Sequence, residues 1–408
     1  MAAVRVLTVG NLYPPHHFGG YEQVWASAVA HLRERGHEVE VLATGFRLPG
    51  VADGDEPGVE RSLRWYWRDH EFAWHGPRER LRIERHNHAA LERRLHALRP
   101  DAVAFWSMGA MSHGLIEAVR RRGLPMAAFV HDEWLDYGRF TDQWLRIYHL
   151  RPLRRLPPLV ERLTGLPTAV DYGAAGRWVF VSDFVRRRAA EVGHRLPDTA
   201  VAHSGIHPDF LGPAEDRPWR GRLLYAGRLH PDKGIHDAVR ALAALPGMTL
   251  EFAGTWDPRE ERALAALVAE LGLGDRVTLL GQLGREAVRE RYRDADALLF
   301  PARWNEPWGL VPLEAMACGC PVVATARGGA AEYLADRDNA LVVPAEDPAA
   351  LAAAVRELAG DPALRARLRA GGARTAPRHT EPIFNAAVER HLHEVAGRAA
   401  PAPGAVAA

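Results

Sequence analysis

The chain has almost no cysteine. Among its 408 residues only Cys318 and Cys320 occur, one residue apart. Two such neighbours without partners elsewhere form neither a disulfide framework nor a zinc site. We therefore expect both to be small packing residues, and we expect no metal site.

Lysine is almost absent as well. Of the 52 basic residues 51 are arginine, and the exception is Lys233. A lysine offers a compact point charge on a flexible stem, which suits a phosphate better than a fork-shaped pairing. Lys233 is therefore either a functional ammonium group or a chance survivor of coding bias.

Long apolar runs and a strong net charge are also missing. No stretch approaches the roughly 18 to 20 apolar residues of a membrane span. A formal net charge of +1 argues against a broad basic face for nucleic acid. The start MAAVRVLTVG leads into a strand pattern rather than a signal peptide. We expect a cytoplasmic protein that has no nucleic-acid partner and no transmembrane segment. Peripheral membrane contact and the oligomeric state stay open.

The length predicts two domains, since one core seldom supports 408 residues. We assign residues 1–208 to an N-terminal acceptor-binding domain and residues 221–378 to a C-terminal nucleotide-sugar-binding domain, joined by a linker at 209–220. A helix at 380–396 is expected to pack back on the first domain, and residues 397–408 are expected to be a disordered tail.

Both domains show apolar strands alternating with helical patterns, which is typical of parallel, doubly wound α/β sheets. The expected strands are Val4–Val9, Glu38–Leu42, Asp101–Trp106, Met126–Val130, Trp178–Ser182 and Thr199–Ala202, then Leu223–Ala226, Thr249–Ala253, Val277–Leu280, Ala297–Phe300, Val322–Ala324 and Ala340–Val343. No regular structure is expected over Asp136–Pro167, and a broken stretch is expected between Arg369 and Pro382.

Candidate ligand contacts in the first domain follow its strands. Gly19 and Gly20 lie between the first strand and a predicted helix at Tyr21–Arg35, where glycine lets the backbone approach a ligand closely. His131 follows the strand Met126–Val130, and ligands bind at the carboxyl ends of parallel strands. A structural role for His131 is the alternative. The G-x-G-x-x-G dinucleotide fingerprint is missing, which disfavours a dehydrogenase.

The composition of one aromatic-rich segment fits either an acceptor pocket or a cap on the sheet. Packing is the favoured interpretation. Its members are Trp65, Tyr66, Trp67, His70, Phe72 and Trp74.

The stretch FPARWNEPWGLVPLEAMACGCPVVAT, residues 300–325, places two carboxylates eight positions apart, at Glu306 and Glu314. Pro312 is expected near the first position of a helix, with Glu314 in or beside its first turn and Gly319 as its end. The backbone N–H groups around Leu310 would then form an anion site. Solvated acids at a helix start are the alternative interpretation.

A second loop supplies the cations. The strand Leu223–Ala226 opens into Gly227–Gly234, which contains Arg228 and Lys233 and precedes a helix. Two cations beside a helix start suit a diphosphate. The alternative is that they pair on the surface with Asp232 and Asp237. A nucleotide sugar carries the three groups that these loops and the two glutamates would bind, namely a diphosphate, a ribose diol and a hydroxylated sugar.

Taken together, these motifs resemble those of retaining glycosyltransferases of family 4, which have the two-domain GT-B architecture. The matching motifs, in the family's order, are Gly19-Gly20, G-H-E-V from Gly36, G-R-L-x-x-x-K-G from Gly227, F-A-G from Phe252, E-x7-E from Glu306, G-x-P from Gly319 and G-G-x-x-E from Gly328.

The resemblance implies two Rossmann-like domains facing each other across a cleft, and a role for each candidate. Arg228 and Lys233 would neutralise the donor diphosphate. Glu314 would bind the ribose, and Glu306 the transferred sugar. Backbone N–H groups at Gly309, Leu310 and Val311, together with the Gly19-Gly20 pair, would contact phosphate or sugar, and His131 would face the sugar.

The reaction implied by the resemblance is transfer of a sugar, with retention, from a nucleotide-diphosphate donor to an unknown hydroxyl acceptor. A UDP-sugar is favoured, and natural-product or cell-envelope glycosylation is the suggested setting. No cofactor is expected. Asp-x-Asp begins at Asp53, Asp294 and Asp336, but none of these follows a strand directly, which favours metal independence. The alternatives are a nucleotide-sugar epimerase, a phosphorylase of the same architecture, or a non-catalytic nucleotide-binding module.

Overall fold

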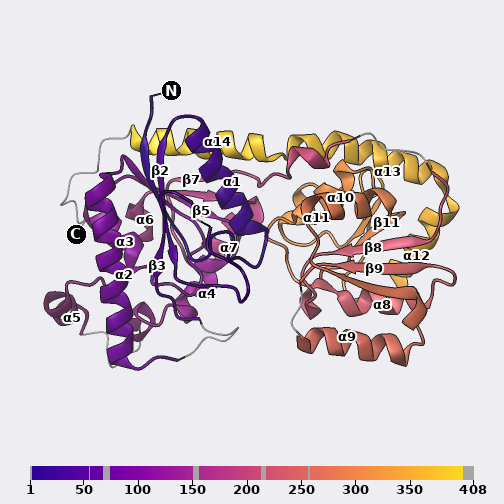
Figure 1. Cartoon of the computed structure of the whole chain (residues 1–408), viewed down its shortest axis with the longest axis horizontal. Coiled ribbons are helices and arrows are strands. Elements are labelled where there is room, and N and C mark those ends of the chain that lie inside the picture. The colour runs from indigo at the N-terminus through magenta and orange to yellow at the C-terminus, as the bar shows by residue number, and fades with distance from the viewer. Residues whose placement is uncertain are drawn as a thin grey trace. The chain divides into compact units, whose positions relative to one another are not determined.

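The computed structural model describes residues 2–54, 56–67, 74–149, 156–212, 217–255 and 258–397. The chain divides into two compact units (Figure 1): unit 1 is formed by Met1–His203 with Phe384–Ala408, and unit 2 by Ser204–Ile383. The expected tail beyond Gly397, and His70 and Phe72 of the aromatic segment, lie outside the described residues.

Unit 1 is built on a parallel sheet with the strand order β3-β2-β1-β4-β5-β6-β7. Its strands are β1 (Arg5–Val9), β2 (Glu38–Thr44), β3 (Val59–Leu63), β4 (Ala102–Phe105), β5 (Met126–Val130), β6 (Arg177–Phe180) and β7 (Thr199–Val201). Its helices are α1 (Gly20–Glu34), α2 (Pro77–Leu98), α3 (Gly114–Arg121), α4 (Trp134–Thr141), α5 (Pro157–Thr164), α6 (Tyr172–Ala175), α7 (Asp183–Glu191) and, from the end of the chain, α14 (Glu381–Ala396), with 3-10 turn η1 (Leu145–His149).

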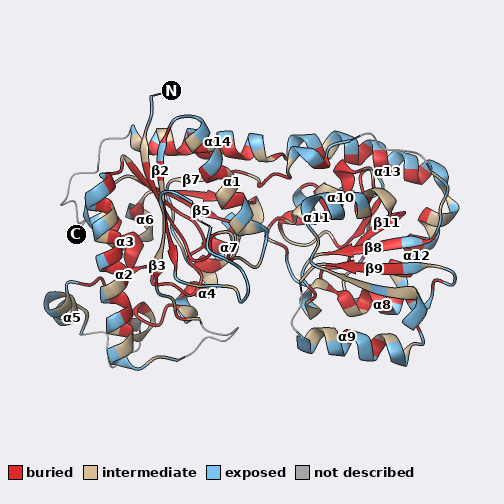
Figure 2. Cartoon of the chain, viewed as in Figure 1, coloured by how far each residue is buried: buried red, intermediate tan, exposed pale blue. Residues whose placement is uncertain are grey.

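The central strands are buried on both faces, as Figure 2 shows in red, because helices cover both sides of a parallel sheet. The region Asp136–Pro167 is more regular than its sequence predicts. At the start of helix α4 the Asp132 carboxylate accepts a hydrogen bond from the Trp134 N–H at 2.9 Å. Helix α5 begins at a Pro-Pro pair and ends at Gly165, whose φ of +72° few other residues adopt.

Unit 2 contains a second parallel sheet with the order β10-β9-β8-β11-β12-β13. Its strands are β8 (Arg222–Ala226), β9 (Thr249–Ala253), β10 (Val277–Gly281), β11 (Ala297–Phe300), β12 (Val322–Ala324) and β13 (Leu341–Val342). Its helices are α8 (Ile235–Ala243), α9 (Pro258–Glu270), α10 (Arg285–Asp294), α11 (Leu310–Ala317), α12 (Pro348–Gly360) and α13 (Pro362–Thr375), with 3-10 turns η3 (Pro208–Phe210), η4 (Pro231–Lys233), η5 (Gly274–Arg276), η6 (Gly329–Glu332) and η7 (Ala376–Arg378).

Two helices of unit 2 differ from their predicted bounds. Pro312 is the third residue of α11 rather than the first, and Glu314 therefore lies in its second turn. Helix α13 continues through Gly371 and Gly372 instead of breaking there. A Cβ atom on Gly371 would lie 2.0 Å from the Asp338 carbonyl oxygen, so glycine permits close packing rather than ending the helix.

The predicted linker 209–220 is associated with unit 2, apart from residues 213–216, which lie outside the described part of the chain. The Gly212 N–H donates to the Ala317 carbonyl at 3.2 Å. The Arg220 N–H donates to the Asp296 carboxylate at 2.8 Å. The boundary between the units accordingly falls at His203, a few residues before the predicted one.

Each sheet has one position where the strand order reverses, and ligands bind there in open α/β sheets. In unit 1 it lies between β1 and β4, and in unit 2 between β8 and β11. The predicted cation loop follows β8 and the loop of Glu306 follows β11. The fold of unit 2 thus brings together two loops that are about seventy residues apart in the sequence.

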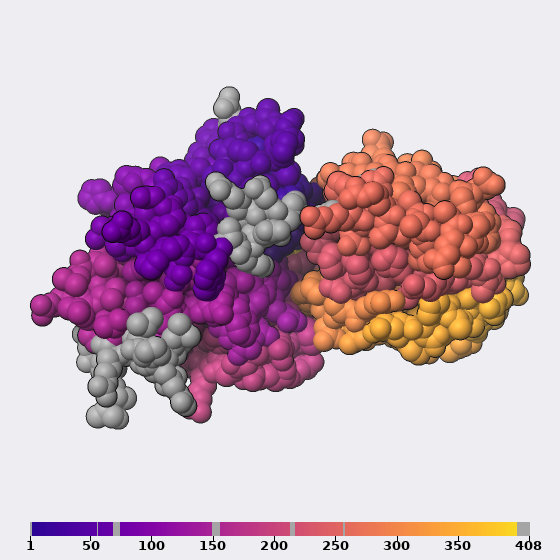
Figure 3. All heavy atoms as spheres, turned by 90° about the horizontal axis from the view of Figure 1, so that it is seen from below, coloured from indigo at the N-terminus to yellow at the C-terminus, as the bar shows by residue number. Residues whose placement is uncertain are grey.

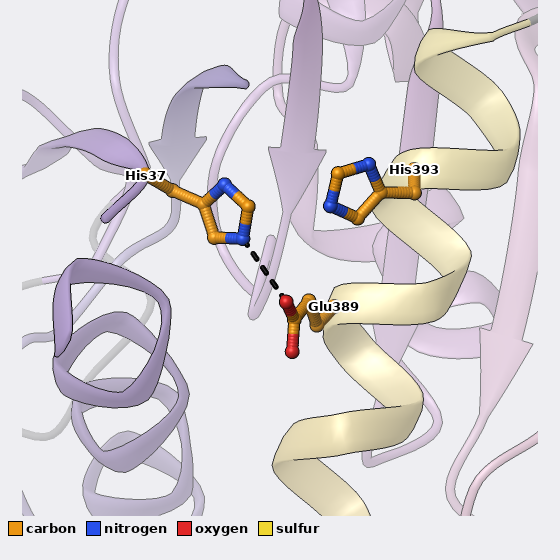
Figure 4. Close-up of side chains that lie close together, drawn as sticks. All are labelled: His37, Glu389 and His393. Atoms are coloured by element: carbon orange, nitrogen blue, oxygen red, sulfur yellow. Dashed lines mark hydrogen bonds and ion pairs between the residues drawn. The ribbon is translucent and has the colours of Figure 1, made fainter. Parts of the chain in front are cut away.

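Helix α14 lies beside α1 in unit 1, where a buried carboxylate attaches it (Figures 1 and 4). The Nε2 atoms of His37 and His31 each lie 3.2 Å from an oxygen of Glu389. Arg35 Nε lies 3.5 Å from the same carboxylate. Although burial alone raises the pKa of Glu389, these donors outweigh it and lower the pKa to about 2.

His37, Glu389 and His393 could in principle share a metal ion, since their ligand atoms lie within 4.8 Å of one another. However, the Val4 N–H donates to His37 Nδ1 at 3.1 Å, so Nε2 carries the ring proton and donates to Glu389. A metal would need the Nε2 lone pair that this proton occupies. The cluster is therefore a hydrogen-bonded attachment of α14.

We predict that Glu389→Gln lowers the free energy of unfolding by about 2 kcal/mol, the value of a lost charge-assisted hydrogen bond. Glu394 lies on the same helix as Glu389 and is half-exposed. Glu394→Gln, which removes its ion pair with Arg177 of β6, should cost less than about 1 kcal/mol. Because the pKa of Glu389 is below its ordinary 4.5, its contribution is present above pH 4.5 and is lost as pH falls toward 2. Thermal unfolding across this range checks both statements, and a wild-type advantage that grew on acidification would contradict them.

Candidate functional site

The loop after β8 carries the predicted cations. Gly227, with φ of +131°, turns the chain out of the strand, and the Tyr225 hydroxyl donates to the Arg228 carbonyl at 2.9 Å. The 3-10 turn η4 then delivers Lys233 directly before α8. The conformation of this loop is therefore set by its own residues and by the strand that precedes it.

The loop after β11 packs directly on this loop. The N–H groups of Arg303 and Trp304 both donate to the Asp232 carbonyl, at 2.7 and 3.2 Å. Gly234 has φ of +72°, and a Cβ atom there would lie 1.9 Å from the Pro301 carbonyl oxygen. The two backbones approach closely because this residue has no side chain.

Lys233 and Glu306 form an ion pair at this contact. Lys233 Nζ lies 2.5 Å from Glu306 Oε1, and the two side chains are only 19% and 6% exposed. The ammonium group also lies over the Trp304 ring, 4.4 Å from its centroid. Burial lowers the pKa of Lys233, while Glu306 opposes this effect by stabilising the charged form.

The sequence left open that Arg228 and Lys233 pair with Asp232 and Asp237 on the surface. No such ion pair is found among the described residues. Asp237 instead accepts two hydrogen bonds from Arg303, at 2.6 and 2.7 Å. The exposed Arg228 guanidinium makes no ion pair with any residue that the structure describes, and its charge contributes to lowering the pKa of Lys233. Two cationic groups therefore lie near each other, and the more exposed one has no carboxylate partner in the described chain.

Glu306 is held in place through its backbone. Its carbonyl accepts the Gly329 N–H at 2.6 Å. Gly328 has φ of +65°, and a Cβ atom there would lie 2.3 Å from the Glu306 carbonyl oxygen. The G-G-x-x-E motif therefore includes the glycine that allows the chain after β12 to pack against the Glu306 loop.

Glu314 is held by a neighbouring tyrosine. The Tyr292 hydroxyl donates to Glu314 Oε2 at 2.9 Å. Burial raises the pKa of Glu314 to about 7, against the effect of this hydrogen bond. Among the described residues no donor is found for Oε1, so one carboxylate oxygen remains able to accept a hydrogen bond from a hydroxyl group.

The start of α11 provides backbone donors between the two glutamates. Gly309 precedes the helix with φ of +85°, and its carbonyl accepts from the Tyr333 hydroxyl at 2.5 Å. The N–H groups of Leu310 and Val311 belong to the first turn, where a helix has no internal acceptors for them. Unit 2 thus combines two cations, a helix start and two carboxylates around one strand reversal, an arrangement suited to a phosphorylated polyol.

The candidates of unit 1 lie close together at the carboxyl edge of their own sheet. The exposed Gly19 precedes α1, and its N–H donates to the Glu22 carboxylate at 3.2 Å. Tyr21, which follows Gly20, packs its ring 4.6 Å from that of His131. Burial lowers the pKa of His131 to about 3, so its imidazole is neutral. Tyr21 therefore places the glycine pair next to His131.

Several supporting side chains were not anticipated from the sequence: Tyr21, Tyr225, Tyr292, Arg303, Trp304 and Tyr333. Trp304 and Arg303 stand two and three positions before Glu306, so proximity alone could have suggested them. Tyr225 lies three positions before the Arg228 carbonyl that it contacts. Tyr21, Tyr292 and Tyr333 are distant in sequence from the groups that they contact, and no spacing rule indicates them.

The acidic pairs Asp294/Asp296 and Asp336/Asp338 are engaged elsewhere. Asp294 accepts from Arg222, and Asp296 accepts the backbone N–H groups of Arg220 and Arg222. The Asp336 carboxylate accepts the Val342 N–H at 2.9 Å. For the third pair, Asp53 binds His16 at 2.6 Å, while residue 55 is outside the described chain.

Two family models together match most of the chain. The family model for glycosyl transferases group 1 matches residues 218–375, and the model for glycosyltransferase family 4 matches residues 18–210. A D-inositol 3-phosphate glycosyltransferase of Streptomyces avermitilis is 33% identical over 335 residues, which cover 70% of this chain and 71% of that protein.

Solved structures with the same fold cover the chain nearly from end to end. Sucrose-phosphate synthase from Thermosynechococcus elongatus has a TM-score of 0.73 at 22% identity, covering 96% of this chain and 98% of that one. Anabaena HepE in complex with UDP and glucose has a TM-score of 0.69 at 19% identity, covering 96% and 100%. These likenesses establish the predicted two-domain GT-B fold.

The ion pair makes a testable prediction about stability. Lys233→Met or Glu306→Gln alone should lower the free energy of unfolding by about 3 kcal/mol, since each leaves a charge buried without a partner. The double variant should lose less than the sum of the two, because both charges are then removed. Thermal unfolding of the four proteins measures the coupling, and strictly additive losses would contradict a direct interaction.

Proposed function

The chain belongs to glycosyltransferase family 4, and we propose that it transfers a sugar from a nucleotide-diphosphate donor to a hydroxyl acceptor. We further propose that the donor is a UDP-sugar, that transfer retains the anomeric configuration and that no metal takes part. The observation that carries this proposal is the convergence of Arg228, Lys233 and the start of α11 beside Glu306, at the strand reversal of unit 2.

The cations support the assignment of the leaving group. Departure of a nucleoside diphosphate concentrates negative charge on its oxygens, and fixed cations and helix N–H groups stabilise that charge. In our proposal Arg228 binds the diphosphate first, because its guanidinium is exposed. Lys233 then exchanges part of its interaction with Glu306 for a phosphate oxygen. The ammonium group has three donors, so it can contact both groups.

The two glutamates would bind the two polyols of the donor. Glu314 Oε1 accepts from the ribose hydroxyls while Tyr292 holds the other oxygen. Glu306, released in part by Lys233, accepts from a hydroxyl of the transferred sugar. Both roles need the ionised form, which hydroxyl donors stabilise.

Unit 1 would supply a neutral hydrogen-bond donor and an exposed stretch of backbone. A neutral His131 can donate one hydrogen bond to a sugar hydroxyl without adding positive charge to the site. Gly19 and Gly20 are exposed at the start of α1, where the N–H groups of the first turn face a ligand. Binding of the acceptor is also assigned to this unit.

We predict opposite effects on UDP affinity for the two members of the ion pair. Lys233→Met should weaken UDP binding about 10- to 100-fold, because one charge-assisted hydrogen bond is lost. Glu306→Gln should leave affinity equal or higher, because the ammonium group is freed. Calorimetry measures both. Arg240→Met, which removes a half-exposed arginine of α8 paired with Asp237, serves as the control and should not change affinity. Unchanged affinity in Lys233→Met would rule out the phosphate assignment.

Turnover separates the role of Glu306 from that of the cations. Glu306→Gln should reduce kcat at saturating donor by at least about 100-fold, the scale of a lost transition-state interaction, while UDP still binds. The rate of UDP release measured with and without acceptor also distinguishes a transferase from an epimerase. Normal turnover in this variant would remove Glu306 from the site.

A further inference from the structure

The chain passes between the two units twice, and the two crossings are hydrogen-bonded to each other. It enters unit 2 after His203 and leaves it after Ile383. On the unit 2 side, the Ile206 N–H donates to the His379 carbonyl at 2.9 Å, and the Glu381 N–H donates to the Ile206 carbonyl at 2.9 Å. The chain therefore enters and leaves unit 2 through one paired segment.

A glycine permits this pairing. A Cβ atom on Gly205 would lie 2.1 Å from the Thr380 carbonyl oxygen. Because Gly205 has no side chain, the two backbones pack directly on each other, and neither can shift without the other. We name residues 204–206 and 379–381 the crossing pair.

Trp308 attaches the loop of Glu306 to the crossing pair. Its indole N–H donates to the Ser204 carbonyl at 2.9 Å, and the residue is only 3% exposed. Its ring centroid lies 5.2 Å from that of His379. Trp308 thus contacts both strands of the crossing pair, while it stands two positions after Glu306 and directly before Gly309.

Tyr333 connects the Trp308 ring to the start of α11. The two ring centroids are 5.0 Å apart, and the Tyr333 hydroxyl donates to the Gly309 carbonyl at 2.5 Å. Gly309 precedes α11 with φ of +85°, a conformation that few other residues adopt. Because a packed interior transmits small displacements, a change at the first turn of α11 would reach the Trp308 ring.

The body of α11 is fixed by a different set of contacts. It packs on α13 and on η7, and a Cβ atom on Gly372 of α13 would lie 3.0 Å from Met316 Cβ. These supporting elements form one side of unit 2, drawn in orange to yellow in Figure 3. The part of this region that can adjust to a ligand is therefore the loop before the helix, residues 306–309.

Helix α14 carries the second crossing into unit 1, where it meets His131. None of the described helices, α14 included, is long and apolar enough to cross a membrane. Phe384, the first residue of the returning chain in unit 1, is 1% exposed, and its ring centroid lies 5.2 Å from that of His131. His379, which contacts Trp308, stands five positions earlier. One short stretch of chain thus joins a residue beside the Glu306 loop to a residue beside His131.

We propose that Trp308 is a positioning residue that couples occupancy of the donor site to the crossing pair. This inference rests on the proposed function, in which a donor diphosphate binds at the start of α11. Two sites are coupled when both bias the same element, and the loop 306–309 is contacted from both sides.

Donor binding would alter this loop at both of its ends. Lys233 releases Glu306 in part, and the N–H groups of Leu310 and Val311 gain an anion as acceptor. The loop then settles in one position, and Trp308 holds the Ser204 carbonyl there. As a result, the hydrogen bonds of the crossing pair open less often.

The test is amide hydrogen exchange of the full chain with and without UDP, because exchange measures such local opening. In the wild type, saturating UDP should slow exchange of the Ile206 and Glu381 amides by about threefold to tenfold, the range that one buried hydrogen bond can transmit. Trp308→Phe keeps a ring against Tyr333 and His379 but has no N–H. In this variant the slowing should fall below about twofold, while UDP affinity in calorimetry stays within about twofold of the wild type.

Trp144→Phe is the matched control. The Trp144 indole N–H donates to the Pro167 carbonyl of unit 1 at 2.7 Å and is also buried, so this variant loses the same kind of hydrogen bond away from the crossing pair. Thermal unfolding should shift by a similar amount in both variants, but UDP should slow exchange in Trp144→Phe as it does in the wild type.

Four results would overturn the inference alone: wild-type UDP binding without slowing at the crossing pair, equal slowing in Trp308→Phe and the wild type, loss of the slowing in Trp144→Phe as well, or loss of UDP affinity in Trp308→Phe. The last result would mean that Trp308 shapes the donor site itself. Absence of UDP binding to the wild type would instead overturn the donor assignment, and this inference with it.

Discussion

The close approach of the two loops at the strand reversal of unit 2 determines the candidate site. Lys233 and Glu306 follow different strands, β8 and β11, and meet only because these strands are neighbours in the sheet. Their backbones can approach because Gly234 has no side chain where the Pro301 carbonyl passes. The Asp232 carbonyl then fixes the register by accepting two N–H groups from the β11 loop. The chemistry of the site thus depends on sheet order first and on one glycine second.

Local patterns in the sequence predict much of this fold, because buried parallel strands are short apolar runs between turn residues. The predicted bounds of β5, β9, β11 and β12 match the structure residue for residue. Segments without such an apolar run give weaker predictions of strands and helices. Strand β3 has the sequence VERSL and lies at the sheet edge, so it lacks the apolar run of a central strand. Helices α4 and α5 were missed for a related reason, since what stabilises them is a carboxylate acceptor and polar contacts to distant elements.

The sequence also predicts the residues of the candidate site better than it predicts the contacts between their side chains. A diphosphate site at Arg228 and Lys233 could be expected from charge and loop position, but the pairing of Lys233 with Glu306 could not, because it is a tertiary contact. The same holds for Glu314, whose hydrogen bond to Tyr292 comes from a different helix. Two glycines led to a wrong prediction of where a helix ends. Gly371 and Gly372 look like a helix break, yet they lie inside α13, where the Asp338 backbone passes close to Gly371 and the Met316 side chain lies against Gly372.

The single lysine of the chain, Lys233, lies at a position where lysine and arginine would interact differently with the neighbouring carboxylate. An arginine at position 233 would bind Glu306 through a planar fork, and releasing the carboxylate would break two aligned hydrogen bonds at once. The Lys233 ammonium is instead a point charge, held between a carboxylate and the Trp304 ring on a flexible stem. It can turn toward a new anion while retaining part of its old contacts. If this buried pair opens on donor binding, as we propose, lysine suits it better than arginine, even in a protein whose other basic residues are all arginine.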